Sequence, residues 1–274
     1  MPPAPPVTWV LESPAFPHRH DALIPAITAA GHRVVQWDDG WWASGRWPQL
    51  GETPVIFQGS LGNAARIRDG LGWRPGAFCD VRAFACSTWY PNAAEWLVHR
   101  QWRVIPAYKL AEDPAAALAR LGAPDAVFVR PDSPLKPFAG RVLARDAITL
   151  AALDHGYYYD DPTIPVVVAP VRALGREWRY VVVDQTVVAG SAYSAADRSA
   201  RADDPSGEAW AFAADVAAKM PPPERAYVLD VCEADGRLWL LEVNPFSGAD
   251  LYACAATDVV SAISAAAASE FSRS

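Results

Sequence analysis

The stretch YVLDVCEADGRLWLLEVNPFSG, residues 227 to 248, places acidic side chains inside two apolar runs. Asp230 interrupts the first run, and Glu242 and Asn244 lie two positions apart in the second, which puts both on one face of a strand. Because DGR at 235 to 237 offers a glycine for a tight turn, the stretch predicts a β-hairpin. Bringing Asp230 opposite Glu242 requires an odd, three-residue loop centred on Gly236, since a one-residue slip reverses the face.

The acidic side chains of this hairpin need a partner. Two carboxylates that face each other on a sheet repel, and burying them unpaired is costly. A hard divalent cation removes that cost, and Mg²⁺ prefers oxygen ligands such as those of Asp230, Glu242 and Asn244. Alternatively, the carboxylates pair with arginine side chains from neighbouring elements, and the spacing alone does not decide between the two.

Two further stretches carry cations that could meet a phosphate. FVRPDSPLKPFAGRV, residues 128 to 142, puts Arg130 at a strand end and Lys136 in the following loop. A solvated basic loop explains these residues equally well. GREWRYVVV, residues 175 to 183, puts Glu177 and Arg179 on one face of a strand, where the arginine could contact phosphate and the glutamate could orient it. A cross-strand ion pair is the alternative.

The composition restricts the partners and the compartment. A formal charge of −7 over 274 residues argues against a general nucleic-acid or membrane-surface binder and favours a small-molecule partner. The four cysteines lack metal-site spacing, so we expect free, buried thiols. We predict a cytoplasmic protein because the start shows no signal-peptide pattern and no long apolar run occurs.

The order of the patterns predicts two domains. The first third alternates strand and helix patterns, which indicates βαβ units and a parallel sheet, and one helix is expected around 92 to 100. From residue 126 hairpins and helices alternate, which indicates an α+β part with an antiparallel sheet. We place the boundary near Pro106, giving domains at 1–105 and 106–274. Eight of the twelve tryptophans precede residue 100, where we expect them to pack the first domain or line a cleft.

Taken in order, three stretches resemble an ATP-grasp domain. FVRPDSPLKPFAGRV resembles the strand and flexible loop of that family, VVVAPVRALGREWRYVVV its hinge and following strand, and the 227–248 hairpin its metal-binding end. The similarity covers roughly residues 106 to 270. It implies an ATP-grasp fold, mixing α/β and α+β parts, with an N-terminal βαβ (Rossmann-like) lobe.

The resemblance also implies ligands. It implies ATP and Mg²⁺ as cofactors, with Mg²⁺ held by Asp230, Glu242 and Asn244. Lys136 and Arg179 would bind phosphates and carry catalysis, and Arg130 stands where the family commonly has lysine. Backbone groups around Val168 and Ala169 would meet the adenine. Because Ala169-Pro170 stands where a hinge acid often sits, Glu177 is the candidate to compensate in nucleotide binding.

The reaction typical of the family joins a carboxylate to an amine or similar nucleophile through an acyl phosphate, with release of ADP. The resemblance therefore implies a ligase acting on small-molecule or peptide substrates, with Ser247 and Gly248 near the acceptor. Arg82, Trp89 and Tyr90 are further candidate contacts from the first domain. A kinase on the same scaffold and a non-catalytic nucleotide-binding module are the alternatives. A homodimer is compatible with the sequence.

Overall fold

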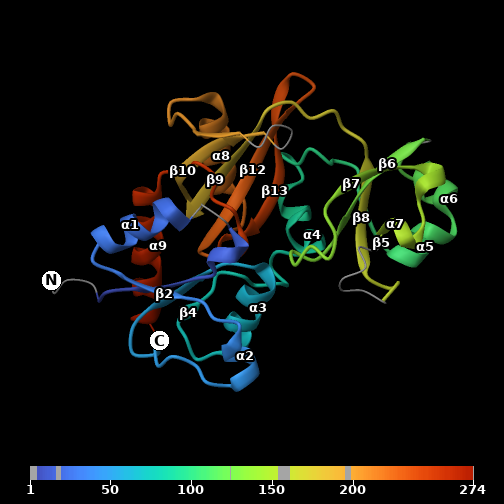
Figure 1. The fold of residues 1–274 in the computed structure, drawn as a ribbon. Coiled ribbons are helices and arrows are strands. Elements are labelled where there is room, and N and C mark those ends of the chain that lie inside the picture. Colours follow the sequence, from blue (N-terminus) through green and yellow to red (C-terminus); the bar gives the residue numbers. More distant parts are fainter. Residues whose placement is uncertain (1–4, 17–19, 124, 154–160, 195–198, 274) are drawn as a thin grey trace. The chain divides into compact units, whose positions relative to one another are not determined.

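The structure, a computed structural model, describes residues 5–16, 20–123, 125–153, 161–194 and 199–273 (Figure 1). The chain forms two compact units. The first unit comprises Met1–Asp80, Arg176–Val231 and Glu242–Ser274, and the second unit comprises Val81–Gly175 and Cys232–Leu241. The chain therefore leaves the first unit twice, after Asp80 and after Val231, and returns to it each time. The boundary expected near residue 105 lies inside the second unit, and as a functional division it stays a prediction.

A parallel sheet opens the first unit. Strand β1 (Thr8–Leu11) lies between β2 (Arg33–Gln36) and β3 (Val55–Gln58), and the short β4 (Pro75–Gly76) pairs with β3. The accompanying helices are α1 (His20–Ala29), α2 (Gly40–Ser44) and α3 (Leu61–Gly70). The predicted βαβ units and the parallel sheet are confirmed.

The second sheet has the order β11-β10-β9-β12-β13. Its elements are β9 (Glu177–Val183), β10 (Thr186–Tyr193), β11 (Ala200–Ala202), β12 (Ala226–Ala234) and β13 (Arg237–Pro245), with the helices α8 (Glu208–Lys219) and α9 (Ala256–Phe271). Strands β9, β10 and β11 pair in antiparallel fashion, as predicted for this part of the chain.

The turn of the β12–β13 hairpin differs from the prediction. Only Asp235 and Gly236 separate the two strands, and both have positive φ, 49° and 73°. Positive φ at both central residues is the type I′ geometry that matches the twist of the flanking strands. The predicted three-residue loop is therefore wrong. If the two strands pair without interruption from a two-residue turn, residue 230 lies opposite residue 241 and not opposite Glu242. This is the one-residue slip that reverses the face.

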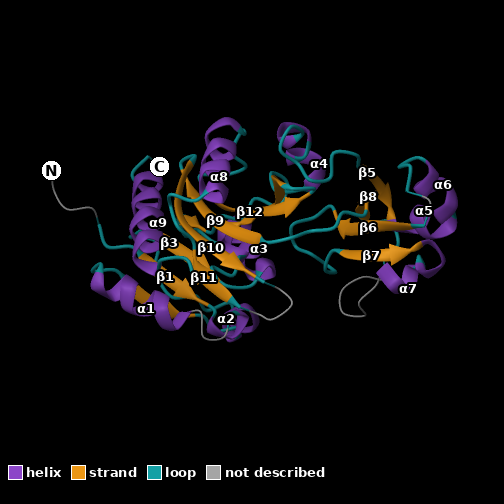
Figure 2. Ribbon diagram, turned by 90° about the horizontal axis from the view of Figure 1, so that it is seen from above, coloured by secondary structure: helices purple, strands orange, loops and turns teal. Residues whose placement is uncertain are grey.

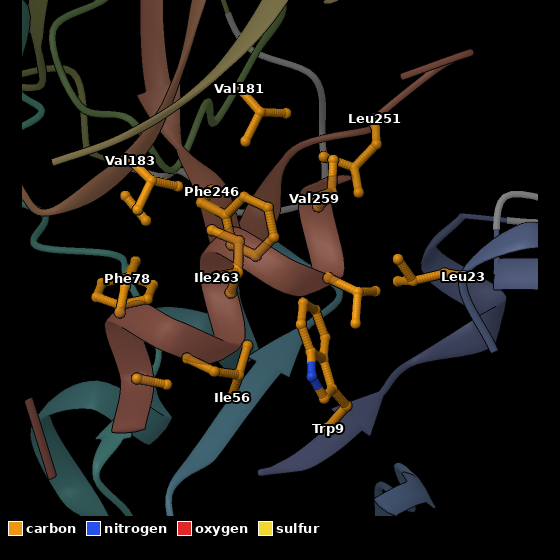
Figure 3. Close-up of a cluster of buried hydrophobic side chains, with 14 of the residues drawn as sticks. Trp9, Leu23, Ile56, Phe78, Val181, Val183, Phe246, Leu251, Val259 and Ile263 are labelled. Carbon is orange, nitrogen blue, oxygen red and sulfur yellow. The ribbon is translucent and has the colours of Figure 1, made fainter. Parts of the chain in front are cut away.

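One hydrophobic core joins both sheets of the first unit. Helix α9 contacts β3 and β4 of the parallel sheet and β9 and β10 of the other. Phe246, directly after β13, packs against Trp9 of β1 with ring centroids 6.3 Å apart, and Ile263 of α9 lies beside them (Figure 3). The indole of Trp9 donates a hydrogen bond to Ser264, 3.1 Å away. The end of the acidic hairpin is therefore anchored in the core.

The early tryptophans pack mainly against one another. Rings of the segment around α2 form edge-on and tilted contacts with centroids 4.5 to 6.3 Å apart, and the guanidinium of Arg66 lies 3.5 Å from the centre of the Trp42 ring. The members of this cluster are Trp37, Trp41, Trp42, Trp47 and Trp73. Of the two roles expected for these residues, packing of the first unit is the one observed.

The second unit contains an antiparallel sheet of order β5-β8-β6-β7. Its strands are β5 (Arg103–Pro106), β6 (Ala126–Pro131), β7 (Arg141–Ala144) and β8 (Pro165–Pro170), and its helices include α5 (Ala107–Glu112), α6 (Pro114–Ala119) and α7 (Leu150–Leu153). These three helices cover one face of the sheet (Figure 2). Val129 and Val168 point into that covered face, so the alternating positions, including Arg130 and Ala169, point to the opposite face.

The helix predicted around residues 92 to 100 is wrong. The structure instead has a short α4 (Cys86–Trp89) and a 3-10 turn at Pro91–Ala93. Beyond them the backbone pairs like a strand, because Val98 donates to Leu240 at 3.0 Å and Leu240 donates to Trp96 at 2.8 Å. Pairing with a neighbouring strand has replaced the local helical hydrogen bonds.

All four cysteines are free, and Cys79, Cys86 and Cys232 are buried, as predicted. Across the described ranges, no helix combines the length and apolar character needed to span a bilayer.

Replacing Ile263 by alanine tests the core of the first unit. Ile263 is fully buried, and we expect Ile263→Ala to lower the free energy of unfolding by about 2–5 kcal/mol, because it leaves a cavity while alanine itself favours the helix. Urea denaturation of the full chain measures the change. Leu150→Ala, which truncates a side chain that is 43% exposed, is the control and should change stability by less than about 1 kcal/mol. Equal losses in both variants would contradict the assignment of this core.

Candidate functional site

A buried ion pair lies at the centre of the first unit's polar residues. Arg179 on β9 donates through Nε to Oδ1 of Asp230 at 2.8 Å and through Nη2 to Oδ2 at 2.7 Å. Its Nη1 donates to the backbone oxygen of Asp250 at 2.9 Å. Both side chains are almost inaccessible to solvent, and Asp230 raises the pKa of Arg179 against the opposing effect of burial. For Asp230, the arginine pairing considered as an alternative is therefore observed.

Two tyrosines flank this ion pair. The rings of Tyr193 and Tyr252 are stacked with centroids 4.5 Å apart and an interplanar angle of 16°. The Arg179 guanidinium lies 4.9 Å from the centre of the Tyr252 ring, a distance at which a cation is attracted to an aromatic face. Tyr252 also has a positive φ of 48°, an uncommon conformation for a bulky residue. Neither tyrosine was nominated from the sequence, although Tyr193 lies opposite Glu177 in the β9–β10 hairpin.

Glu177 lies in a region of concentrated negative charge. Its carboxylate accepts a hydrogen bond of 2.8 Å from the hydroxyl of Tyr193. Burial raises the pKa of Glu177, and the charges of Asp230 and Glu242 raise it further, while the Tyr193 hydroxyl and Arg179 lower it. The carboxylates of Asp230 and Glu242 therefore both act on the same group, as expected for residues of one site.

The oxygen ligands predicted for Mg²⁺ are partly in place. Asp230 and Asn244 are buried and Glu242 is half-buried. The Nδ2 atom of Asn244 is buried without a hydrogen-bond partner within the described residues. Amide nitrogen and oxygen positions can be interchanged, so Asn244 can instead present its oxygen to a cation.

A closed metal cage is not formed: in the described ranges no three His, Cys, Asp or Glu side chains converge as metal ligands. Mg²⁺ does not require such a cage, because it keeps several waters and is bound by one or two carboxylates together with substrate phosphates. Glu242 and Asn244 fit this mode of binding. Asp230, whose two carboxylate oxygens accept from Arg179 and which an uninterrupted ladder places opposite residue 241, stays a predicted ligand.

The turn after β13 is held by packing. The Ser247 side chain is fully buried, and its Oγ accepts a 2.9 Å hydrogen bond from the backbone N–H of Phe78. The backbone oxygen of Ser247 accepts from Gly59 at 2.9 Å. A Cβ atom on Gly248 would lie 2.2 Å from a side-chain carbon of Leu61, so only glycine fits. These contacts are structural, and the prediction that Ser247 and Gly248 contact an acceptor rests on the resemblance alone.

The second unit carries the other predicted nucleotide contacts. Arg130, at the end of β6, is buried beside His99. The His99 ring stacks on Phe128 at 4.6 Å with an interplanar angle of 9°. Burial lowers the pKa of His99 to about 4, and the charges of Arg130 and Arg172 act in the same direction. His99 is thus a neutral aromatic surface on the face of the sheet that carries Arg130.

The other residues of this unit that are predicted to contact the nucleotide differ in strand pairing and backbone conformation. Val168 pairs with β5 on one side and β6 on the other, and its side chain lies in the hydrophobic cluster. Ala169 pairs with Phe128 of β6 and lies beyond the paired part of β5. Lys136 lies in the loop after β6 with a positive φ of 49°. Of the two residues predicted near the adenine, Ala169 is the one that is not paired with β5.

Two of the three substrate contacts predicted in the first domain have buried side chains. Trp89 and Tyr90 are 2% and 0% exposed and contact each other with ring centroids 4.5 Å apart. Their side chains fill the core of the α4 segment, and the expectation that they contact a substrate stays a prediction. Arg82 is exposed. Asp132 holds this segment by accepting from the backbone N–H and the hydroxyl of Ser87, at 2.7 and 2.8 Å.

A family model described as an ATP-grasp domain matches residues 109–262, more than half of the 274-residue chain. This chain belongs to the ATP-grasp family. The predicted ATP-grasp fold is confirmed with it. A search of curated proteins gave no match.

Solved structures share the fold of this ATP-grasp protein at low sequence identity. D-cycloserine synthetase DcsG matches with a TM-score of 0.61 and 17% identity, over 95% of this chain and 99% of that one. The D-alanine–D-alanine ligase of Bacillus anthracis in complex with ATP matches with a TM-score of 0.58 and 12% identity, over 98% and 95%. The ligase PsnB, complexed with a precursor variant, Mg and ADP, matches with a TM-score of 0.55 and 14% identity, over 96% and 98%.

A double-mutant cycle tests the buried ion pair of the ATP-grasp protein. We expect Arg179→Met and Asp230→Leu each to lower the free energy of unfolding by about 3–5 kcal/mol, because each leaves an uncompensated buried charge. The double variant should recover most of that loss, since it leaves neither charge. Urea denaturation of all four proteins measures the coupling. Losses that simply add in the double variant would show that the pair is not coupled.

The buried His99 predicts a pH dependence of stability. Its pKa in the folded protein is about 4, below the ordinary value of 6.5, so between these values the unfolded chain binds more protons than the folded one. Stability should therefore decrease as the pH falls through this window. In His99→Phe, which keeps an aromatic ring, the loss between pH 7 and pH 5 should be smaller by roughly 1–2 kcal/mol. Urea midpoints at both pH values measure this, and identical losses in the two proteins would refute it.

Proposed function

We propose that this ATP-grasp protein is an ATP-dependent, ADP-forming ligase that joins a carboxylate to an amine or a similar nucleophile through an acyl phosphate. The observation that carries the proposal is the buried Arg179–Asp230 pair, together with the charges of Asp230 and Glu242 that act on the same Glu177 and the unpartnered amide of Asn244. It places a fixed guanidinium beside an oxygen-rich set, in a family to which nucleotide-dependent ligases belong. Of the three solved structures described above, two are named as ligases and one as a synthetase.

Arg179 is suited to bind phosphate because its orientation is already determined. Three of its five N–H donors bond to Asp230 and Asp250, and the other two can donate to a phosphoryl or acyl phosphate oxygen. Holding the guanidinium in place before the substrate binds reduces the entropy lost on reaching the transition state. Asp230 is thus both a candidate metal ligand and the residue that positions Arg179.

We assign the metal to Asp230, Glu242 and Asn244. When bound there, Mg²⁺ would supply charge neutralisation of the ATP phosphates. The chain's own part is to present oxygens: the carboxylate of Glu242 and the amide of Asn244 lie on one face of β13, as positions i and i+2 require.

The nucleotide contacts of the second unit complete the proposal. Arg130 and Lys136 would bind phosphates, and Ala169, beside Val168, would present its backbone to the adenine. An arginine at position 130 keeps the charge of a lysine and adds a planar fork for bidentate binding. Glu177 would contribute to nucleotide binding through a carboxylate that is oriented by Tyr193.

The substrates would be small molecules or peptides that supply one carboxylate and one amine. The solved structures that share this fold include a D-alanine–D-alanine ligase and a ligase complexed with a precursor peptide, so both sizes of substrate occur on this fold. Four free cysteines, three of them buried, support a reducing, cytoplasmic location. Assembly as a homodimer stays a prediction.

ADP release tests the proposed activity. The full chain with ATP and Mg²⁺ is supplied with amino acids, short peptides and small acids, singly and in pairs. We expect ADP only when a carboxylate and an amine are both present. Glu242→Gln should lower the rate by about 100-fold or more, because it removes a charged metal ligand. Glu52→Gln, at an exposed carboxylate of the same unit, should retain the wild-type rate.

The remaining outcomes distinguish the alternatives. A stable phosphorylated product from a single substrate would identify a kinase, and nucleotide binding without turnover would identify a binding module. Unchanged activity in Glu242→Gln would overturn the metal assignment.

A further inference from the structure

A polar cavity lies in the second unit, outside the site described above. It has a volume of about 440 Å³ and is lined by residues of two segments, 100–103 and 120–122. Three of its lining residues are arginines: Arg100, Arg103 and Arg120. A cavity of this volume lies within the range of small-ligand sites.

The three arginines of this cavity, Arg100, Arg103 and Arg120, are exposed. Within the part of the chain that the structure describes, none of them forms an ion pair or a side-chain hydrogen bond. Acidic residues outnumber basic ones in this chain, which has a net charge of −7. Even so, these three arginines form no ion pair with them in the described ranges. Like charges gathered around one cavity repel each other, so the arrangement favours binding of an anion from solution.

The register of the sheet separates this cavity from the candidate nucleotide site. Arg103 pairs with Val168, whose side chain points into the helix-covered face of the sheet. Directly opposed residues in an antiparallel pair point to the same face, so Arg103 lies on the helix-covered face. Arg120 directly follows α6, which packs on that face. Arg130 pairs with Val167 and therefore points to the other face.

Trp102 gives the cavity a rigid apolar wall. Its ring is half-buried and stands edge-on to the buried Tyr90, with centroids 5.2 Å apart and an interplanar angle of 88°. This contact limits the motion of the indole, which can present an apolar surface next to the three cations. The lining therefore combines one aromatic residue that is packed in place with three exposed arginines.

We propose that the cavity formed by Arg100, Trp102, Arg103 and Arg120 binds a small polyanion with at least two oxyanion groups. Guanidinium forks bind both phosphate and carboxylate groups through paired N–H donors, and three of them can engage more than one such group. The seven lining residues form a site too small for a nucleic-acid duplex. The ligand is thus a phosphate-bearing or carboxylate-bearing small molecule.

Isothermal titration calorimetry of the full chain at low ionic strength tests this site, with pyrophosphate and citrate as separate probes. We expect saturable binding of one probe molecule to the cavity. The double variant Arg103→Gln/Arg120→Gln should weaken it by about tenfold or more, because two charge-assisted contacts are lost. The single variant Arg100→Gln should weaken it less. These exposed positions should tolerate the substitutions, and thermal unfolding checks that they do.

Arg145→Gln is the matched control, because Arg145 is an exposed arginine of the same unit outside the cavity. Tighter binding of pyrophosphate would identify a phosphate ligand, and tighter binding of citrate a carboxylate ligand. The proposal is overturned if neither probe binds, if the double variant binds both probes like wild type, or if Arg145→Gln weakens binding equally.

Discussion

The buried ion pair between Arg179 and Asp230 is the interaction on which the rest of the first unit's site depends. Transferring two charges from water into a protein interior is costly unless both are paired and hydrogen-bonded. Here the pairing is bidentate, and a third donor of the same guanidinium reaches the backbone of Asp250. The pair thereby joins β9, β12 and the segment after β13, three parts of the chain that are far apart in sequence.

Two aromatic side chains and an acidic one lie around the Arg179–Asp230 pair. Arg179 lies against Tyr252, which stacks on Tyr193, and Tyr193 donates to Glu177. Glu177 retains a raised pKa because burial and two neighbouring carboxylates outweigh the tyrosine and the arginine. The result is a site with one fixed cation, a stacked aromatic pair and an excess of acidic oxygens. This composition suits a substrate that brings both phosphate groups and a metal ion.

The hairpin that carries these oxygens is positioned by the core. Phe246 packs against Trp9, and Ser247 bonds to Phe78, so the residues directly after Asn244 are held by the parallel sheet and α9. Functional groups on strands that end in a packed core can be positioned more accurately than groups on free loops. Gly248 is part of the same packing, because Leu61 occupies the space that a side chain at position 248 would need.

Much of the fold was readable because local patterns and tertiary structure agree. The alternation of strands and helices in the first third predicted a parallel sheet, and the hairpins of the second part predicted an antiparallel one. The failures occur where distant partners decide. Residues 96–98 pair with Leu240 rather than forming a helix. The Asp235-Gly236 dipeptide by itself favours the two-residue turn that the structure has.

The sequence by itself determined which chemical groups are available and in which order: the acidic hairpin, the Arg130 and Lys136 stretch, and the strand with Glu177 and Arg179. Those patterns were sufficient for the ATP-grasp family. Only the tertiary structure decided that Asp230 takes Arg179 as its partner, that Ser247 faces the core, and that three arginines surround a cavity on the helix-covered face of a sheet. The physical reason is that pairing and burial depend on which strands become neighbours and in which register, and spacing along one chain does not contain that information.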